Sequence, residues 1–258
     1  ANKNLQKQMY CEGLAYKLTP IEYGGTGGTN TEKMLALLNN DYDLVKRNGD
    51  SVKTGFDWGN MKGEGVLVDY YTMRMVQNLR LQMMKLSDQL INENRYDDAL
   101  NVLNITFEEM PVEKEQVPAD DICYYLCANY FEAGDTTKGM EIGHTLVSLQ
   151  LDRLNFFSDL DKDKFLPYVW PELGRALFNV EMLREASLTN LDRNKMFEPN
   201  NATNNASFLA KGVLANTNYD EICLKLRNVY RNNPQKRKFF ENQQKFPSYY
   251  TQLWKSGI

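Results

Sequence analysis

The fold of this chain is decided by residues 83–111, which read MMKLSDQLINENRYDDALNVLNITFEEMP. Apolar or small side chains stand at the spacing that two packed helices need, namely Met83, Leu86, Ser87, Leu90, Ala99 and Leu103. Polar residues 94–98 separate the two halves and predict a turn, and Pro111 predicts the end of the second helix. The stretch therefore predicts one helical hairpin, in which small Ser87 and Ala99 let the helices approach closely.

A second copy of this pattern starts 40 residues later, with Cys123 in the place of Met83. The matching positions are Cys123, Leu126, Cys127, Tyr130, Gly139, Gly143 and Leu146. Residues 133–137 supply the turn, and Pro118 in the linker of residues 112–118 prevents one continuous helix. The repeat predicts antiparallel hairpins over residues 69–109 and 120–149.

This spacing resembles the tetratricopeptide repeat, whose helical hairpins stack into an α-α superhelix and bind other molecules more often than they catalyse reactions. A third copy at residues 170–199 is open. Trp170, Leu173 and Gly174 match its start, but residues 180–182 carry no turn residues. That absence favours one long helix there.

The predicted fold class is therefore all-α, a tetratricopeptide-like α-α superhelix with an irregular N-terminal segment. Residues 1–66 form that segment, packed on the body, and residues 67–258 form the helical-repeat domain with C-terminal capping helices. The aromatic tail, residues 239–254, is expected to cap the last repeat.

Within the N-terminal segment, residues 14–21 alternate like a short strand or extended arm. Thr29 and Glu32 form a predicted capping box that opens a helix to about Val45. Residues 48–65 are rich in glycine and are expected to be irregular, with Trp58 pinning them to the helical body. The alternative is that Trp58 is exposed and binds a partner.

Composition excludes several classes of function. The net charge is −4 and the longest basic run is residues 236–238, which argues against a nucleic-acid partner. No apolar run approaches the roughly 20 residues of a membrane-spanning helix. Four cysteines do not make a disulfide framework, and Cys123 and Cys127 occupy packing positions. With His144 as the single histidine, no metal and no cofactor is expected.

No constellation of residues predicts catalysis. The glycine-rich loop of residues 24–28 precedes a predicted helix, as a phosphate-binding loop would. It lacks the third glycine of a dinucleotide motif, where Asn30 stands, and the Lys-Ser/Thr pair of a nucleotide-binding loop. A mobile loop is the favoured interpretation. No catalytic residue is assigned.

A partner-binding groove is predicted on the first helix of each hairpin. In repeats of this type, residues one, five and eight places after the first motif position face the concave surface. The residues so placed are Met84, Asp88 and Ile91 in the first hairpin and Tyr124, Ala128 and Phe131 in the second. A protein or peptide could lay apolar side chains there, with Asp88 at the rim. Alternatively, a flanking segment such as residues 239–254 fills the groove permanently.

Residues 12–21, residues 56–60, Arg74-Met75 and the repeat pair together resemble one known family. It comprises the soluble C-terminal region of bacterial multi-pass membrane proteins of unknown function. These are related to protein O-mannosyltransferases of the glycosyltransferase-C type. The resemblance covers about residues 5–160 and departs from the family pattern at residues 24–28.

The resemblance implies a domain on the periplasmic face of a bacterial membrane, soluble as a fragment, with a membrane-spanning half upstream of Ala1. The transferase site would lie in that half, so no family catalytic residue is carried onto this chain. The implied role is an accessory domain that positions an acceptor protein or stabilises the enzyme. The alternative is a stand-alone repeat adaptor that binds a peptide or protein. The sequence of the full-length gene would separate the two.

Overall fold

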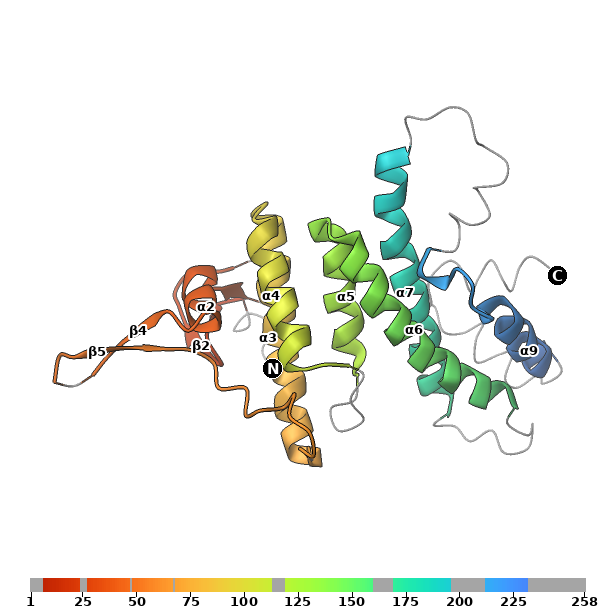
Figure 1. Ribbon diagram of the computed structural model, residues 1–258, viewed down its shortest axis with the longest axis horizontal. Coiled ribbons are helices and arrows are strands. Elements are labelled where there is room, and N and C mark those ends of the chain that lie inside the picture. The colour runs from red at the N-terminus through yellow and green to blue at the C-terminus, as the bar shows by residue number, and fades with distance from the viewer. Residues whose placement is uncertain are drawn as a thin grey trace. The chain divides into compact units, whose positions relative to one another are not determined.

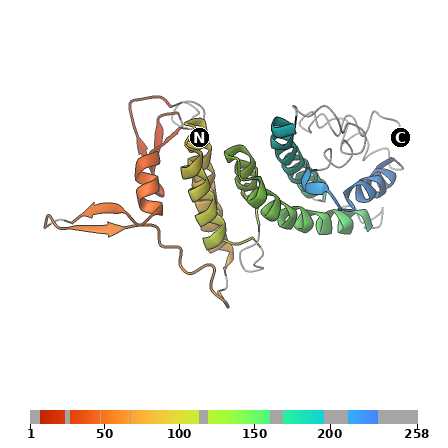
Figure 2. The same cartoon turned by 45° about the horizontal axis from the view of Figure 1, so that its top comes forward.

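The computed structural model describes residues 7–23, 27–46, 48–66, 68–112, 119–159, 169–195 and 212–231 (Figures 1 and 2). These residues are mostly helical, with two small sheets near the N-terminus. The chain divides into two compact units, Ala1–Asp135 and Thr136–Ile258. The boundary predicted at residue 66 lies within the first unit. The aromatic tail, residues 239–254, lies outside the described residues.

The N-terminal sheet has three short strands, β1 (Met9–Glu12), β2 (Ala15–Leu18) and β3 (Gly28–Thr29). β1 lies in the middle, antiparallel to β2 and parallel to β3. β2 confirms the extended segment expected within residues 14–21. The two sheets show that the all-α prediction is wrong for this region. β1 forms its hydrogen bonds with β2, which precedes the glycine loop, and with β3, which lies at the end of that loop.

Gly28 is required by the aromatic packing around β3. The rings of Tyr10 and Tyr23 stack with their centroids 4.8 Å apart. A Cβ atom on Gly28 would lie 2.6 Å from Cδ1 of Tyr23 and 2.9 Å from Cδ2 of Tyr10. This glycine therefore serves close packing. Residues 24–26 of the glycine loop lie outside the described ranges.

Helix α2 (Thr31–Leu38) begins one residue later than predicted and ends earlier. Its N-cap is Asn30, whose side-chain oxygen accepts a hydrogen bond from the Lys33 backbone amide at 3.1 Å. The predicted capping box with Thr29 is therefore wrong, because Thr29 belongs to β3. The helix does not reach Val45, since Asn40 adopts a left-handed conformation (φ 56°) that ends the helical segment.

The segment after α2 forms a two-stranded hairpin, β4 (Tyr42–Val45) and β5 (Ser51–Thr54). Gly49, with φ 91°, lies in the turn between the two strands. β5 corrects the prediction that residues 48–65 are irregular throughout. Each of the two strands is only four residues long. They are held in an extended conformation by pairing with each other, which composition alone does not predict.

The predicted first hairpin is present. α3 (Tyr70–Asn92) packs against α4 (Tyr96–Glu109) across a three-residue connection. Asp69 caps α3 by accepting a hydrogen bond from the Thr72 amide at 2.8 Å. Asn94, with φ 59°, reverses the chain. The predicted packing residues are all buried: Met83, Leu86, Ser87, Leu90, Ala99 and Leu103.

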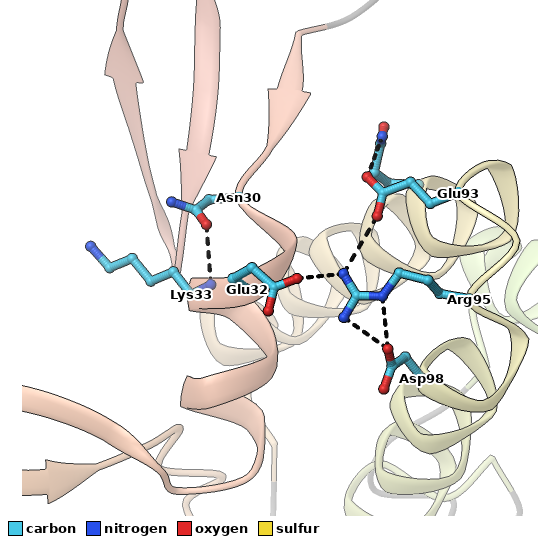
Figure 3. Close-up of polar contacts among 7 residues, drawn as sticks. Asn30, Glu32, Lys33, Glu93, Arg95 and Asp98 are labelled. Carbon is cyan, nitrogen blue, oxygen red and sulfur yellow. Dashed lines mark hydrogen bonds and ion pairs between the residues drawn. The ribbon is translucent and has the colours of Figure 1, made fainter.

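Arg95 ties the α3–α4 turn to α2 (Figure 3). Its guanidinium pairs with Glu32 of α2 and with Asp98 in the first turn of α4, the latter at 2.8 Å. A third carboxylate, Glu93, lies 3.6 Å away. The Arg95–Glu32 pair is the one of these that reaches α2, and because the Glu32 side chain is 78% exposed it contributes little to stability.

Helix α5 (Asp121–Ala133) packs against both α3 and α4. Asp120 caps it, accepting hydrogen bonds from the Ile122 and Cys123 amides through Oδ1. The other oxygen of Asp120 pairs at 3.1 Å with Arg80 of α3, whose side chain is 1% exposed. Gly134, with φ 96°, ends the helix. The Asp120 carboxylate thus caps the N-terminus of α5 and also links this helix to α3.

The second unit contains α6 (Thr136–Asp159), α7 (Val169–Lys195), a 3-10 turn η2 (Gly212–Leu214) and α9 (Tyr219–Arg231). α6 packs against α7, η2 and α9. α6 runs ten residues past the predicted end at residue 149, because buried Leu151 and Leu154 continue its apolar face. α7 confirms one long helix over the arguable third repeat.

Trp58 packs where the sequence places an anchor. It lies partly buried against a cluster formed by Met61, Val76 and Met110. Val76 belongs to α3, so this contact pins the segment between β5 and α3 onto the helical body. The anchoring role expected for Trp58 is confirmed.

The buried position of Ala99 makes it intolerant of larger side chains. Ala99 is 0% exposed on α4, in the face that packs against α3. We expect Ala99→Leu to lower the free energy of unfolding by about 1–3 kcal/mol, because the added atoms must displace packed neighbours. Thermal unfolding measures this loss. A melting temperature within a degree of the wild type would contradict the assigned packing.

Candidate partner-binding face

The six residues predicted to bind a partner fall into two groups. On α3, the side chains of Met84, Asp88 and Ile91 are half-buried. On α5, Tyr124 and Phe131 are 1% exposed and Ala128 is 9% exposed. The exposure that an external partner needs is therefore found on α3, whereas the α5 residues have the burial of a core.

The three α3 residues share one face of the helix. Asp88 lies four residues after Met84 and three before Ile91, the spacings at which helical side chains are neighbours. A carboxylate therefore stands between two apolar side chains. The carboxylate can accept a hydrogen bond or pair with a positively charged group, while Met84 and Ile91 contact apolar groups of the same ligand.

Asn129 of α5 holds Asp88 in place. Its side-chain nitrogen donates to Oδ1 of Asp88 at 2.6 Å and to the Ser87 hydroxyl oxygen at 2.8 Å. The Ser87 hydroxyl in turn donates to the Met84 carbonyl at 2.9 Å. Asn129 is 6% exposed, so this small network lies at the α3–α5 contact. It joins the first helices of the two predicted hairpins.

Sequence reasoning missed Asn129. It follows Ala128 and is neither an apolar motif position nor one of the predicted groove positions. Its partners lie 41 and 42 residues away in the chain. The available signal was an amide within the uncharged stretch of residues 122–131, since a polar side chain among core residues needs a hydrogen-bond partner.

Partial burial destabilises the charged form of the Asp88 side chain. Burial raises its pKa above the usual aspartate value, and the hydrogen bond from Asn129 opposes that rise only in part. Across the described ranges, Asp88 forms no ion pair with a lysine, arginine or histidine. The negative charge is therefore partly shielded from water, without a compensating cation among those residues.

A second polar cluster attaches the N-terminal sheet to α3. Gln82 accepts from the Cys11 thiol at 3.0 Å and donates to the Tyr16 hydroxyl at 2.9 Å. Lys85 donates to the same hydroxyl at 3.1 Å. Burial raises the pKa of the Cys11 thiol, which keeps it protonated and unreactive. The cluster is a structural tie between β1, β2 and α3.

The other cysteines are likewise unsuited to nucleophilic chemistry. Burial raises the pKa of Cys123 and of Cys223 to about 12, and also raises that of Cys127. Within the described ranges, no three His, Cys, Asp or Glu side chains are grouped to hold a metal ion.

No family model, curated protein or solved structure matches this chain at a significant level. None of the helices within the described ranges is both long and apolar enough to cross a bilayer.

Ionised Asp88 should cost the fold stability at neutral pH. A carboxyl whose pKa is raised by folding binds its proton more tightly when folded. The contribution of Asp88 to stability therefore falls as the pH rises from the unfolded pKa, near 3.8, through the folded one. We expect Asp88→Asn, which keeps an acceptor for Asn129, to be more stable at pH 7 by up to about 1 kcal/mol.

Urea unfolding at pH 3 and pH 7 checks this expectation. The two proteins should have equal stability at the lower pH, where Asp88 is protonated, and should differ only at the higher one. Asp97→Asn, the same change at an exposed carboxylate of α4, serves as the control. A destabilised Asp88→Asn at pH 7 would show that the carboxylate is compensated within the fold.

Proposed function

We propose that this chain is a non-catalytic, tetratricopeptide-like helical-repeat domain that binds an extended polypeptide segment through α3. The observation that carries the proposal is the half-exposed face of Met84, Asp88 and Ile91, held at the α3–α5 contact by Asn129. A shielded carboxylate between apolar side chains is suited to binding, and no described residue of opposite charge pairs with it.

The helix arrangement of the first unit supports the same proposal. α3 packs against α4 within its hairpin and against α5, the first helix of the next predicted hairpin. Packing of first helix on first helix is what stacked helical hairpins require, and it aligns their faces into a continuous surface. The small, buried residues Ser87 and Ala99 allow the close approach of α3 and α4 within the first hairpin.

The setting that we propose for this domain rests on the family resemblance. There it would position an acceptor protein for, or stabilise, a membrane-bound glycosyltransferase-like protein on the periplasmic side. A stand-alone adaptor would use the same α3 face for a peptide or protein partner. Both candidates therefore predict polypeptide binding at Met84, Asp88 and Ile91.

Peptide display tests the proposal directly, because selection from random sequences needs no named partner. A random dodecapeptide library is selected on the full 258-residue chain and, in parallel, on the Met84→Lys/Ile91→Lys variant. We expect the wild type to enrich related peptides and the variant to lose them, because two added charges oppose apolar contact. Tyr125→Lys, an added charge at a 41% exposed α5 position, should retain them.

Unchanged melting temperatures must accompany the comparison, so that lost binding reports on the face alone. Enrichment of the same peptides by the wild type and the double variant would place the binding surface elsewhere. Failure of the wild type to enrich any peptide family would contradict a polypeptide-binding domain.

A further inference from the structure

We infer that the α3 face recognises a lysine or arginine side chain of its polypeptide partner, with Asp88 as the counter-charge. This inference rests on the proposed function and adds the chemistry of the partner. It follows from comparing Asp88 with other largely buried carboxylates of this protein, which pair with a cation.

Two largely buried carboxylates elsewhere in the described residues are compensated by a cation. The pairs are Asp120–Arg80 and Glu181–Arg184, at N–O distances of 3.1 and 2.7 Å. Asp88 is also shielded, but the group that holds it is the neutral amide of Asn129. No cation among the described residues pairs with Asp88, so a counter-charge would have to be supplied from outside them.

The hydrogen bonds around Asp88 fix its carboxylate for such a ligand. The Asn129 amide nitrogen donates to both Oδ1 of Asp88 and Ser87, so its two protons are used. Oδ2 of Asp88 accepts no hydrogen bond from another described residue. A buried amide thus positions the carboxylate while one oxygen remains open to a donor.

Met84 and Ile91, which flank Asp88, can pack against the apolar part of a basic side chain. Lysine and arginine carry an apolar stem below a charged head, and the stem packs against apolar surface while the head reaches a polar group. Met84 and Ile91, one helical turn to either side of Asp88, offer that surface. A negatively charged partner would instead add like-charge repulsion in a shielded place, which disfavours acidic segments.

The peptides selected on the full chain supply the test. We expect them to share a lysine or arginine at one position between apolar residues. Synthetic, N-acetylated versions exclude the terminal amine as the cation. Fluorescence anisotropy should then show affinity about tenfold or more weaker when that basic residue is replaced by norleucine, since a charge-assisted hydrogen bond contributes on this scale.

Asp88→Asn is the decisive variant. It should bind the basic peptide with the weakened affinity and should no longer distinguish it from the norleucine peptide. Asp97→Asn, the matched control on α4, should discriminate as the wild type does.

The outcomes separate this inference from the proposed function. Peptides that bind at the α3 face without a preference for lysine or arginine would overturn the inference and leave the function standing. The same holds if Asp88→Asn keeps full discrimination. Absence of any selected peptide would remove both.

Discussion

Arg80→Ala is expected to lower the free energy of unfolding by about 3–5 kcal/mol, the cost of breaking a buried ion pair from one side. The Arg80 side chain is 1% exposed and pairs at 3.1 Å with Asp120, the residue that caps α5. Removing it leaves the carboxylate uncompensated and leaves a cavity between α3 and α5. Chemical denaturation of the full chain measures the loss.

Two further variants show that the pair itself is responsible. Arg74→Ala removes an exposed arginine from the same helix and should change stability by less than about 0.5 kcal/mol. Asp120→Ser keeps an N-cap oxygen but removes the negative charge. It should still destabilise the fold strongly, because Arg80 is then buried without its carboxylate partner. If Arg80→Ala unfolds like the Arg74 variant, α3 and α5 do not meet as described.

Tyr124→Ala is expected to lower the free energy of unfolding by about 3–5 kcal/mol, as truncation of a buried aromatic side chain does. Tyr124 is 1% exposed although its position predicted a groove residue. The neighbouring Tyr125 is 41% exposed on the same helix and provides a matched control. Tyr125→Ala should leave the melting temperature nearly unchanged.

The comparison also separates a groove from a core on α5. Large destabilisation confined to the Tyr124 variant supports a core position. Weakened peptide binding by Tyr124→Ala with an unchanged melting temperature would instead show that Tyr124 contacts the partner.

The helical hairpin is readable from sequence because its determinants are local. Leu86, Leu90 and Leu103 follow the helical period, and small Ser87 and Ala99 mark where helices approach. The alternating pattern of residues 14–21 predicts β2, but no comparable periodicity predicts the other strands near the N-terminus. They are two to four residues long, and β1 pairs with β3 across the glycine loop, so their order arises from tertiary pairing.

The candidate site is readable only in part, for the same reason. The helical period places Met84, Asp88 and Ile91 on one face, which is a local property of α3. The partner of Asp88 is Asn129, and the partner of Arg80 is Asp120, each about 40 residues away. Such pairings depend on how α5 packs on α3, and neither composition nor motif spacing specifies them.

Chemical-shift mapping of a selected basic peptide on the isotope-labelled full chain tests the central claim most directly. Binding at the α3 face predicts that the largest amide shifts cluster at Met84, Asp88 and Ile91, together with the side-chain amide of Asn129. Asp88→Asn should weaken the interaction while the same residues respond. Shifts confined to other helices, with α3 unaffected, would contradict a binding role for this face.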